Sequence, residues 1–340
     1  LYAMVGLQRD SSVATEAAMK YFVLGALASG MLLYGMSLLY GVTGSLEIAK
    51  VAAALPQLDH MNTVLVFGLV FIVAGLAFKL GAAPCHMWLP DVYQGAPTAI
   101  TLIVGSAPEL AAFAFLIRLL SEGLGPLLAH WQPMLALMAL LSIAIGNITA
   151  IAQTNIKRML AYSTISHMGF LLLGFLGGNA NAYSAAMFYV IVYVLTTLVG
   201  FGMIMLLSRS GFEADQISDF KGLARTHPAV AAAFVLFALS LIGIPPTAGF
   251  VGKLFLFNAA IQGGFYWLAV IGILNSTISL YYYFKIVMAM YMEEPQGSTP
   301  LSFSPPLTVA LGVTAFATLF IGLYPEPLIR AALQSIQIFL

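Results

Sequence analysis

The 340-residue sequence has few charged residues and a single cysteine. Charged residues make up 8% of the chain, whereas soluble domains carry about 25%. Thirteen basic and thirteen acidic residues give a formal net charge of +0, so the sequence lacks the basic surface that nucleic-acid binding requires. The lone Cys85 excludes an internal disulfide and a multi-cysteine metal site. A soluble, disordered or disulfide-rich secreted protein is therefore excluded.

Apolar residues dominate what remains. They make up 61% of the chain, and the mean hydropathy is +0.97. Apolar runs of about 20 residues, the length that crosses a bilayer, recur between short polar breaks. Backbone groups in lipid must be bonded within the segment, which favours helices, and the short alternating segments of a β-barrel are missing. The sequence predicts an all-α polytopic membrane protein with about nine spans: 18–42, 62–83, 97–120, 132–153, 159–177, 182–208, 228–257, 264–291 and 306–324.

The first residues and the loops give an expected topology. The run Leu1–Leu7 is too short to span, and we interpret it as the end of a helix whose start is missing, in the C-terminal part of a longer protein. Alternating spans divide the basic loop residues between two sides. Side A receives Arg9, Lys157, Arg158, Arg209, Lys221 and Arg225, and side B receives Lys50, Arg118 and Arg330. The excess on side A predicts that side A is cytoplasmic, with loop 209–227 there as a short interfacial helix and the C-terminus periplasmic.

Two spans are interrupted by proline and glycine. The first interruption follows Lys79 at Gly81-Ala82-Ala83-Pro84, and the second precedes Lys253 at Gly243-Ile244-Pro245-Pro246. Proline removes a backbone donor and frees the carbonyl four residues earlier. Such breaks line ion sites in transporters, although a passive proline kink is the alternative for either one. The lysine beside each break favours an ion site.

Ionisable side chains at mid-membrane depth are costly and usually functional. The sequence places such groups on separate spans or breaks, and we predict a proton relay from Lys79, His86, Glu109, His167 and Lys253. Lys79 and Glu109 lie at similar depth on consecutive spans, which favours an ion pair over the alternative of an unpaired Glu109 that burial keeps protonated. His86 is expected on the face of Lys79. Lys20 is a further candidate that equally fits a snorkelling anchor. We find no nucleotide-binding loop, haem pattern or metal-ligand set, so no cofactor is expected in this chain.

Three long motifs carry a resemblance to a known family. They are Phe78 to Pro97, including Pro84-Cys85-His86-Met87-Trp88-Leu89-Pro90; Gln153 to Gly169; and Gly243 to Lys253. These segments resemble the antiporter-like membrane subunits of bacterial respiratory complex I, and Asp91 to Pro97 favours the subunit N branch. The resemblance runs over essentially the whole chain.

The resemblance implies a bundle with two inverted repeats, each containing a broken helix. It implies the rest of the first repeat at 1–130, the second repeat at 131–292, and a last helix with the C-terminus at 293–340. Lys79, His86, His167, Lys253 and Lys20 match family relay positions, whereas Glu109 stands where the family usually has lysine. The family's fifth-helix glutamate would lie just before Leu1.

The resemblance also implies a function, a location and partners. The chain would be a proton-translocating subunit of NADH:quinone oxidoreductase in the bacterial inner membrane. Its partners would be neighbouring membrane subunits of complex I and the lipid bilayer. NADH, flavin, iron-sulfur clusters and quinone would bind in other subunits. The alternatives are a subunit of a multi-subunit Na⁺/H⁺ antiporter, a stand-alone secondary transporter and, least compatible with the buried charges, a structural spacer.

Overall fold

A computed structural model describes residues 1–58, 63–208, 212–295 and 305–338. Helices account for nearly all the regular structure in these ranges, which confirms the predicted all-α class. The first half contains α1 (Tyr2–Val5), α2 (Ser12–Thr43), α3 (Ile48–Ala54), α4 (Thr63–Leu80), α5 (Trp88–Gly95), α6 (Thr98–Val104), α7 (Ala107–Ile117) and α8 (Leu128–Ile151). The second half contains α9 (Ile156–Leu173), α10 (Ala180–Leu207), α11 (Leu223–Thr226), α12 (Pro228–Ile242), α13 (Ala248–Gln262), α14 (Tyr266–Met292), α15 (Pro305–Leu323) and α16 (Glu326–Gln337).

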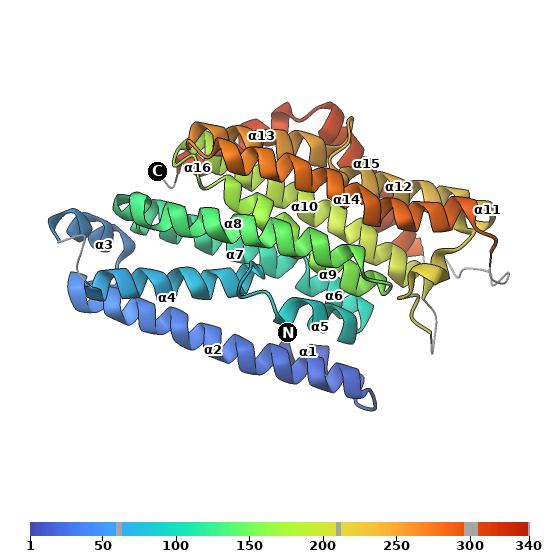
Figure 1. Cartoon of the computed structure of the whole chain (residues 1–340), viewed down its shortest axis with the longest axis horizontal. Coiled ribbons are helices and arrows are strands. Elements are labelled where there is room, and N and C mark those ends of the chain that lie inside the picture. Colours follow the sequence, from blue (N-terminus) through green and yellow to red (C-terminus); the bar gives the residue numbers. More distant parts are fainter. Residues whose placement is uncertain (59–62, 209–211, 296–304, 339–340) are drawn as a thin grey trace.

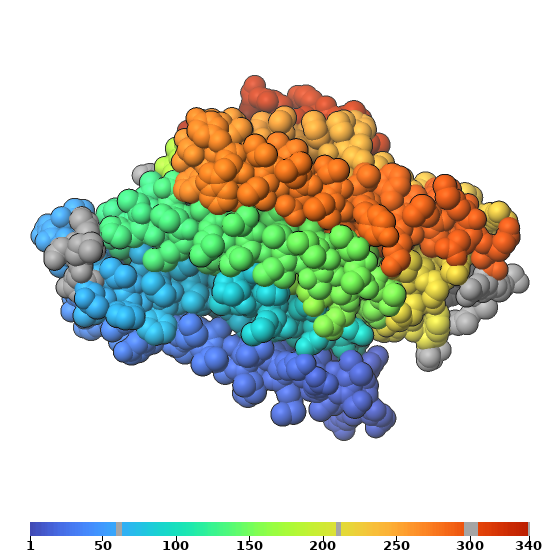
Figure 2. Space-filling model, in the orientation of Figure 1, coloured from blue at the N-terminus to red at the C-terminus, as the bar shows by residue number. Residues whose placement is uncertain are grey.

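The long helices lie side by side along one axis and form a bundle (Figure 1). Helix α2, in blue, forms one edge, and the C-terminal segments, in red, lie at the opposite edge above α14 (Figure 2). The coloured bands of the space-filling view run along the long axis. Helix α2 packs mainly on α4 and exposes large apolar side chains such as Phe22, Leu27 and Leu33. A helix that exposes this much apolar surface suits contact with lipid or with another apolar helix.

Seven helices in the described ranges are long and apolar enough to cross a membrane. Two of the nine predicted spans are not among these seven. Segment 228–257 is divided into the short helices α12 and α13 by the second break. Helix α9 carries more polar residues than a lipid-facing span, and almost all of its side chains are buried. Because α9 lies inside the bundle against α8, it does not need an apolar outer face.

The loops assigned to side A meet at one end of the bundle. Arg158 and Lys20 both contact Asp91, and Lys157 contacts Glu213. The opposite end holds α3, the segment after α7, and α16 (Figure 1). This arrangement agrees with the predicted alternation of sides. Which end is cytoplasmic remains a prediction from the positive charges, and Arg209 lies outside the described residues.

The polar loop at this end does not form the expected interfacial helix. Residues Ile217–Phe220 form a 3-10 turn and α11 follows as a separate short helix. Ile217, Phe220 and Leu223 are buried within the protein, and Phe220 packs on Phe234 of α12. The apolar spacing that suggested contact with a membrane surface instead attaches the loop to the bundle.

Candidate functional site

The first break ends α4 and supplies its own hydrogen-bond partners. Ala83 N–H donates to Ser142 Oγ of α8 at 2.8 Å, and the Trp88 indole N–H donates to the Phe78 carbonyl at 3.0 Å. Backbone groups freed by a break must find such partners when water is excluded. The break is therefore held by hydrogen bonds to α8 and from the first residue of α5.

Lys79 lies on an exposed face of α4. No ion pair or hydrogen bond joins it to another residue in the described parts of the chain, so the predicted pair with Glu109 is wrong. His86 is half-buried within the break itself, and its Nδ1 atom is buried without a hydrogen-bond partner. Because residues 81–87 are not helical, the helical spacing that placed His86 on the face of Lys79 does not apply.

Glu109 is buried in the first turn of α7, with 2% of its surface exposed. Helix α6 ends at Val104, and α7 restarts at Ala107-Pro108 directly before this carboxyl group. The amino end of a helix favours negative charge. The Glu109 Oε2 atom has no hydrogen-bond partner in the described residues. Glu109 is thus a buried carboxyl group without the lysine partner that the sequence predicted.

The second break holds Lys253 between two helices. Lys253 is 3% exposed, and its ammonium donates to the carbonyls of Leu241 at 2.8 Å and Ile242 at 2.9 Å. A third bond, 2.7 Å long, reaches Ser276 Oγ of α14. The two carbonyls are the last of α12, where the helix dipole favours a cation. Lys253 thus lies at the second break, where the carbonyls at the end of α12 are its hydrogen-bond partners.

Glycine makes room for this lysine. Gly243, which ends α12, has a φ of +89°, a conformation that side chains rarely adopt. A Cβ atom there would lie 3.0 Å from Lys253 Cδ. The Lys253 ammonium also lies 4.6 Å from the centre of the Phe170 ring on α9, close enough for a cation–π contact.

His167 lies deep in α9, with 3% of its surface exposed. Its Nδ1 atom shares a 2.6 Å hydrogen bond with the Tyr189 hydroxyl of α10, and its ring lies 5.2 Å from that of Tyr193. The centres of the His167 and Phe170 rings are 6.2 Å apart, so Phe170 contacts both His167 and Lys253. This cluster joins α9, α10 and α13, and Lys79, on the exposed face of α4, is not part of it.

Lys20 has a different environment. It forms ion pairs with Glu16 at 2.6 Å and Asp91 at 2.7 Å, and Asp91 also binds Arg158 at 2.7 Å. The Lys20 side chain is 42% exposed. These contacts support the anchoring interpretation and tie α2, α5 and α9 together at one end of the bundle.

The hydroxyl-bearing residues of this region were not predicted. Tyr193 donates to Thr164 Oγ1 at 2.7 Å, and Tyr282 donates to Asn147 Oδ1 at 3.0 Å. The spacing of Tyr189 and Tyr193, four residues apart on one helix face, is the signal in the sequence that indicates a phenol stripe beside His167.

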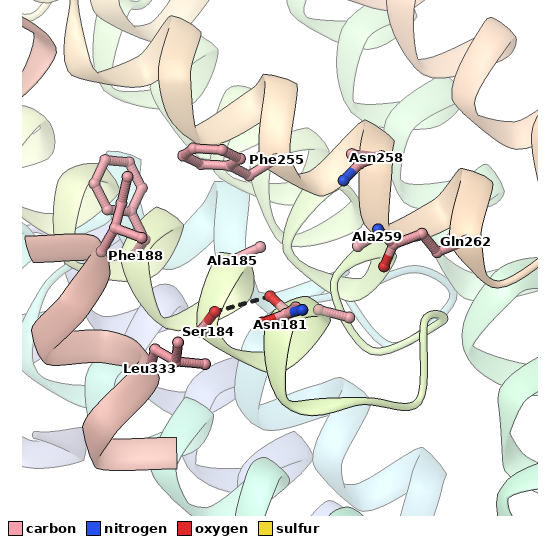
Figure 3. Close-up of a pocket in the computed structure, with 11 residues that line it drawn as sticks. Asn181, Ser184, Ala185, Phe188, Phe255, Asn258, Ala259, Gln262 and Leu333 are labelled. Atoms are coloured by element: carbon pink, nitrogen blue, oxygen red, sulfur yellow. Dashed lines mark hydrogen bonds between the residues drawn. The ribbon is translucent and has the colours of Figure 1, made fainter. Parts of the chain in front are cut away.

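A separate cavity of about 240 Å³ lies between α10, α13 and α16 (Figure 3). Uncharged polar side chains, including Asn181, Ser184, Asn258 and Gln262, line one part of it, and Phe188 and Phe255 line another. None of the predicted relay residues lines it. In the described ranges no group of three or more His, Cys, Asp or Glu side chains is placed to hold a metal ion.

Comparison of the sequence with known proteins identifies a family and close relatives. Residues 1–279 match the family described as NADH:quinone oxidoreductase/Mrp antiporter, transmembrane. The chain is 58% identical over 336 residues to the NADH-quinone oxidoreductase subunit N of Thiobacillus denitrificans, covering 99% of this chain and 70% of that relative.

Solved structures share the fold. A chain of respiratory complex I from Thermus thermophilus is 36% identical, with a TM-score of 0.84, over 97% of this chain and 71% of that one. A chain of the Mrp complex from Dietzia sp. has a TM-score of 0.85 at 24% identity, covering 99% of this chain and 71% of that one. The second likeness concerns the fold alone.

Proposed function

The chain belongs to the NADH:quinone oxidoreductase/Mrp antiporter family, in the subunit N branch, and we propose that its buried ionisable groups form the proton path of that subunit. It is a membrane subunit of respiratory complex I, the assembly that couples NADH oxidation by quinone to proton pumping. Electron transfer belongs to partner subunits, which would hold the flavin, iron-sulfur and quinone sites.

We place Glu109, His167 and Lys253 at the centre of this path. Glu109 and Lys253 each lie at a helix end whose dipole favours their charged form. Each is therefore able to hold charge in a place that lipid alone would make costly. The His167 ring contacts the rings of Tyr193 and Phe170, and Phe170 in turn contacts the Lys253 ammonium. Lys79 and His86, at the first break, would carry protons between the exposed face of α4 and these buried groups.

The environment of Lys253 is the observation that carries the proposal. A buried ammonium whose three donors meet two break carbonyls and a serine hydroxyl is held in place without a carboxylate partner. A structural lysine is usually neutralised by a fixed anion, because an unpaired buried charge costs stability. A proton carrier instead gains from having no permanent counter-ion, since its charge must come and go.

The experiment is Lys253→Met in the assembled complex, reconstituted in vesicles. Proton pumping and coupled quinone reduction should fall, because methionine keeps the length of the side chain and removes the proton. Lys50→Met is the matched control, since Lys50 is exposed and paired with Glu47. Pumping by Lys253→Met equal to that of the Lys50 control would contradict the proposal.

Orientation is part of the proposal. The basic residues gathered at the end of the bundle that holds Arg158 and Lys221 support a cytoplasmic location for that end. Accessibility of a cysteine introduced at Glu293, which lies at that end, to a membrane-impermeant reagent in intact cells would test the assignment. Labelling of this cysteine in intact cells would place that end of the bundle in the periplasm and reverse the assigned orientation.

A further inference from the structure

Lys285, on α14, takes no part in the proposed proton path. Its side chain is half-buried, and its ammonium makes one long hydrogen bond, 3.4 Å, to the Gln153 carbonyl. It forms no ion pair with a described residue, whereas the neighbouring Lys221 pairs with Glu293 at 2.7 Å. An ammonium has three donors, so Lys285 retains the capacity to bind an anion from outside the chain.

Lys285 lines a pocket of about 280 Å³ at the end of the bundle that holds Lys221. The wall carries two ammonium groups, from Lys221 and Lys285, and one carboxylate, from Glu293. Thr154 and Ser218, which bear hydroxyl groups, also line it. Ammonium and hydroxyl groups are donors, and phosphate oxygens accept from such donors.

Backbone hydrogen bonds fix two walls of this pocket. The Ile217 N–H donates to the Thr154 carbonyl, just before α9, at 3.0 Å, and the Gly222 N–H donates to the Ala289 carbonyl of α14 at 3.0 Å. The loop that carries Lys221 is thus bonded to the segment before α9 and to α14. The pocket is therefore formed before any ligand arrives.

Two further acids lie on this loop, and neither lines the pocket. Asp215 accepts a hydrogen bond from the Asn155 amide at 2.7 Å, and Asp219 accepts one from the Gln216 backbone N–H at 2.9 Å. With two lysines and one glutamate on its wall, the pocket itself presents an excess of one positive charge.

The depth of Lys285 corresponds to the boundary of the hydrocarbon layer. Ser276 lies at the level of the second break, because its hydroxyl accepts from Lys253. At 1.5 Å per residue, Lys285 follows Ser276 along α14 by about 14 Å, and half of a bilayer core is about 15 Å thick. Because the sequence places the second break near mid-membrane depth, Lys285 lies where phospholipid headgroups lie.

An apolar face of α14 runs from Lys285 toward the middle of the membrane. Helix α14, in orange, lies at the surface of the bundle (Figure 2). Tyr281, Leu274 and Val270 are exposed by 58%, 61% and 56%, and their helical spacing puts them on the same face as Lys285. A headgroup at the pocket would therefore have its acyl chains beside this face.

We propose that this pocket binds a membrane phospholipid, with the phosphodiester on Lys285 and an acyl chain along Tyr281 and Leu274. A phosphodiester carries one negative charge, which balances the excess positive charge of the pocket. Basic pockets between transmembrane helices are known to hold phospholipid headgroups in this way. The proposal goes beyond the proposed function and does not depend on the proton path.

The test uses the assembled complex in detergent and two photoreactive probes. One is phosphatidylglycerol with a diazirine group in the middle of an acyl chain, and the other is a diacylglycerol with the same chains and no phosphate. Mass spectrometry after irradiation maps the labelled residues. Phosphatidylglycerol should label α14 between Val270 and Tyr281 about tenfold more than the diacylglycerol, because hydrogen bonds to charged groups are strong. Equal labelling by the two probes would overturn the proposal.

Variants test the ammonium itself. Lys285→Gln should lower labelling by phosphatidylglycerol to the level of the diacylglycerol, and Lys285→Arg should keep it, because arginine also binds phosphate. Arg225→Gln is the matched control, since Arg225 lies at the same end, pairs with Glu294 and is not part of the pocket. Native gels report the amount of assembled complex. The comparison of the two probes on the unmodified complex needs no variant, so it decides the proposal even if Lys285→Gln fails to assemble.

Three other results would also overturn the proposal. Unchanged labelling in Lys285→Gln would show that the ammonium does not hold the headgroup. Displacement of the probe by inorganic phosphate, but not by chloride at equal ionic strength, would assign the pocket to free phosphate. Absence of label from α14 would show that a neighbouring subunit covers this face. None of these results bears on Lys253→Met, which tests the proposed function separately.

Discussion

Replacing Glu109 by glutamine removes one exchangeable proton and keeps the shape of the side chain. Two effects compete in this variant. The loss of negative charge at the amino end of α7 costs about 0.3–1 kcal/mol, the usual contribution of a charge near a helix end. The loss of the proton carrier slows transfer by about 10²–10⁴-fold, which corresponds to about 3–5 kcal/mol in the activation barrier. The effect on transfer exceeds the effect on stability.

We therefore expect Glu109→Gln to assemble normally and to pump poorly. The stability cost is small beside the roughly 5–15 kcal/mol that separates folded from unfolded states of typical proteins. The assay is proton yield per electron pair in reconstituted vesicles, with the amount of complex measured in the same membranes. Glu122→Gln is the matched control, because Glu122 is a half-buried glutamate paired with Arg118 at the end of the bundle. A normal proton yield in Glu109→Gln would show that this carboxyl group carries no proton.

Two other substitutions test the packing around the site. Asp91→Asn leaves Lys20 and Arg158 without their shared anion. Because bonds to charged groups contribute about 1.5–3 kcal/mol each, the variant complex should dissociate at a lower temperature in a thermal-stability assay. An unchanged transition temperature would show that this ion-pair cluster adds nothing to the stability of the complex. Gly249→Ala places a Cβ atom 1.8 Å from the Ser240 carbonyl oxygen, so we expect little assembled complex on native gels. Normal assembly of this variant would mean that α12 and α13 can separate without loss of stability.

The breaks show what a sequence can predict well. Proline and glycine act locally, so Pro84 and Pro245 identify the ends of α4 and α12 whatever packs around them. The burial of Lys253 is predictable for the same reason, because its ammonium finds partners in the carbonyls freed at the nearby break.

The pairing of Lys79 with Glu109 shows what a sequence cannot predict. Depth in the membrane follows from counting residues, but the direction of a side chain depends on the rotation of its helix. Helix α6 stops at Val104 and α7 restarts after Ser106, so the count of 3.6 residues per turn does not carry through to Glu109. The hydrogen bond between Ser163 and Tyr283 was missed for a different reason, since serine and tyrosine are ordinary residues of apolar helices and only the packing of α9 against α14 brings these two together.

The three bonds of Lys253 have a consequence for how the subunit switches. A charged ammonium has three N–H donors, and all three are used at the second break. When the proton leaves, the neutral amine keeps two donors for the two carbonyls and gains a lone pair, to which the Ser276 hydroxyl can donate by turning from the Ile242 carbonyl. The donors and acceptors around Nζ thus stay paired in either charge state, and discharge of the lysine reverses the direction of one hydrogen bond. The charge of Lys253 on α13 is in this way linked to the orientation of a hydroxyl group on α14.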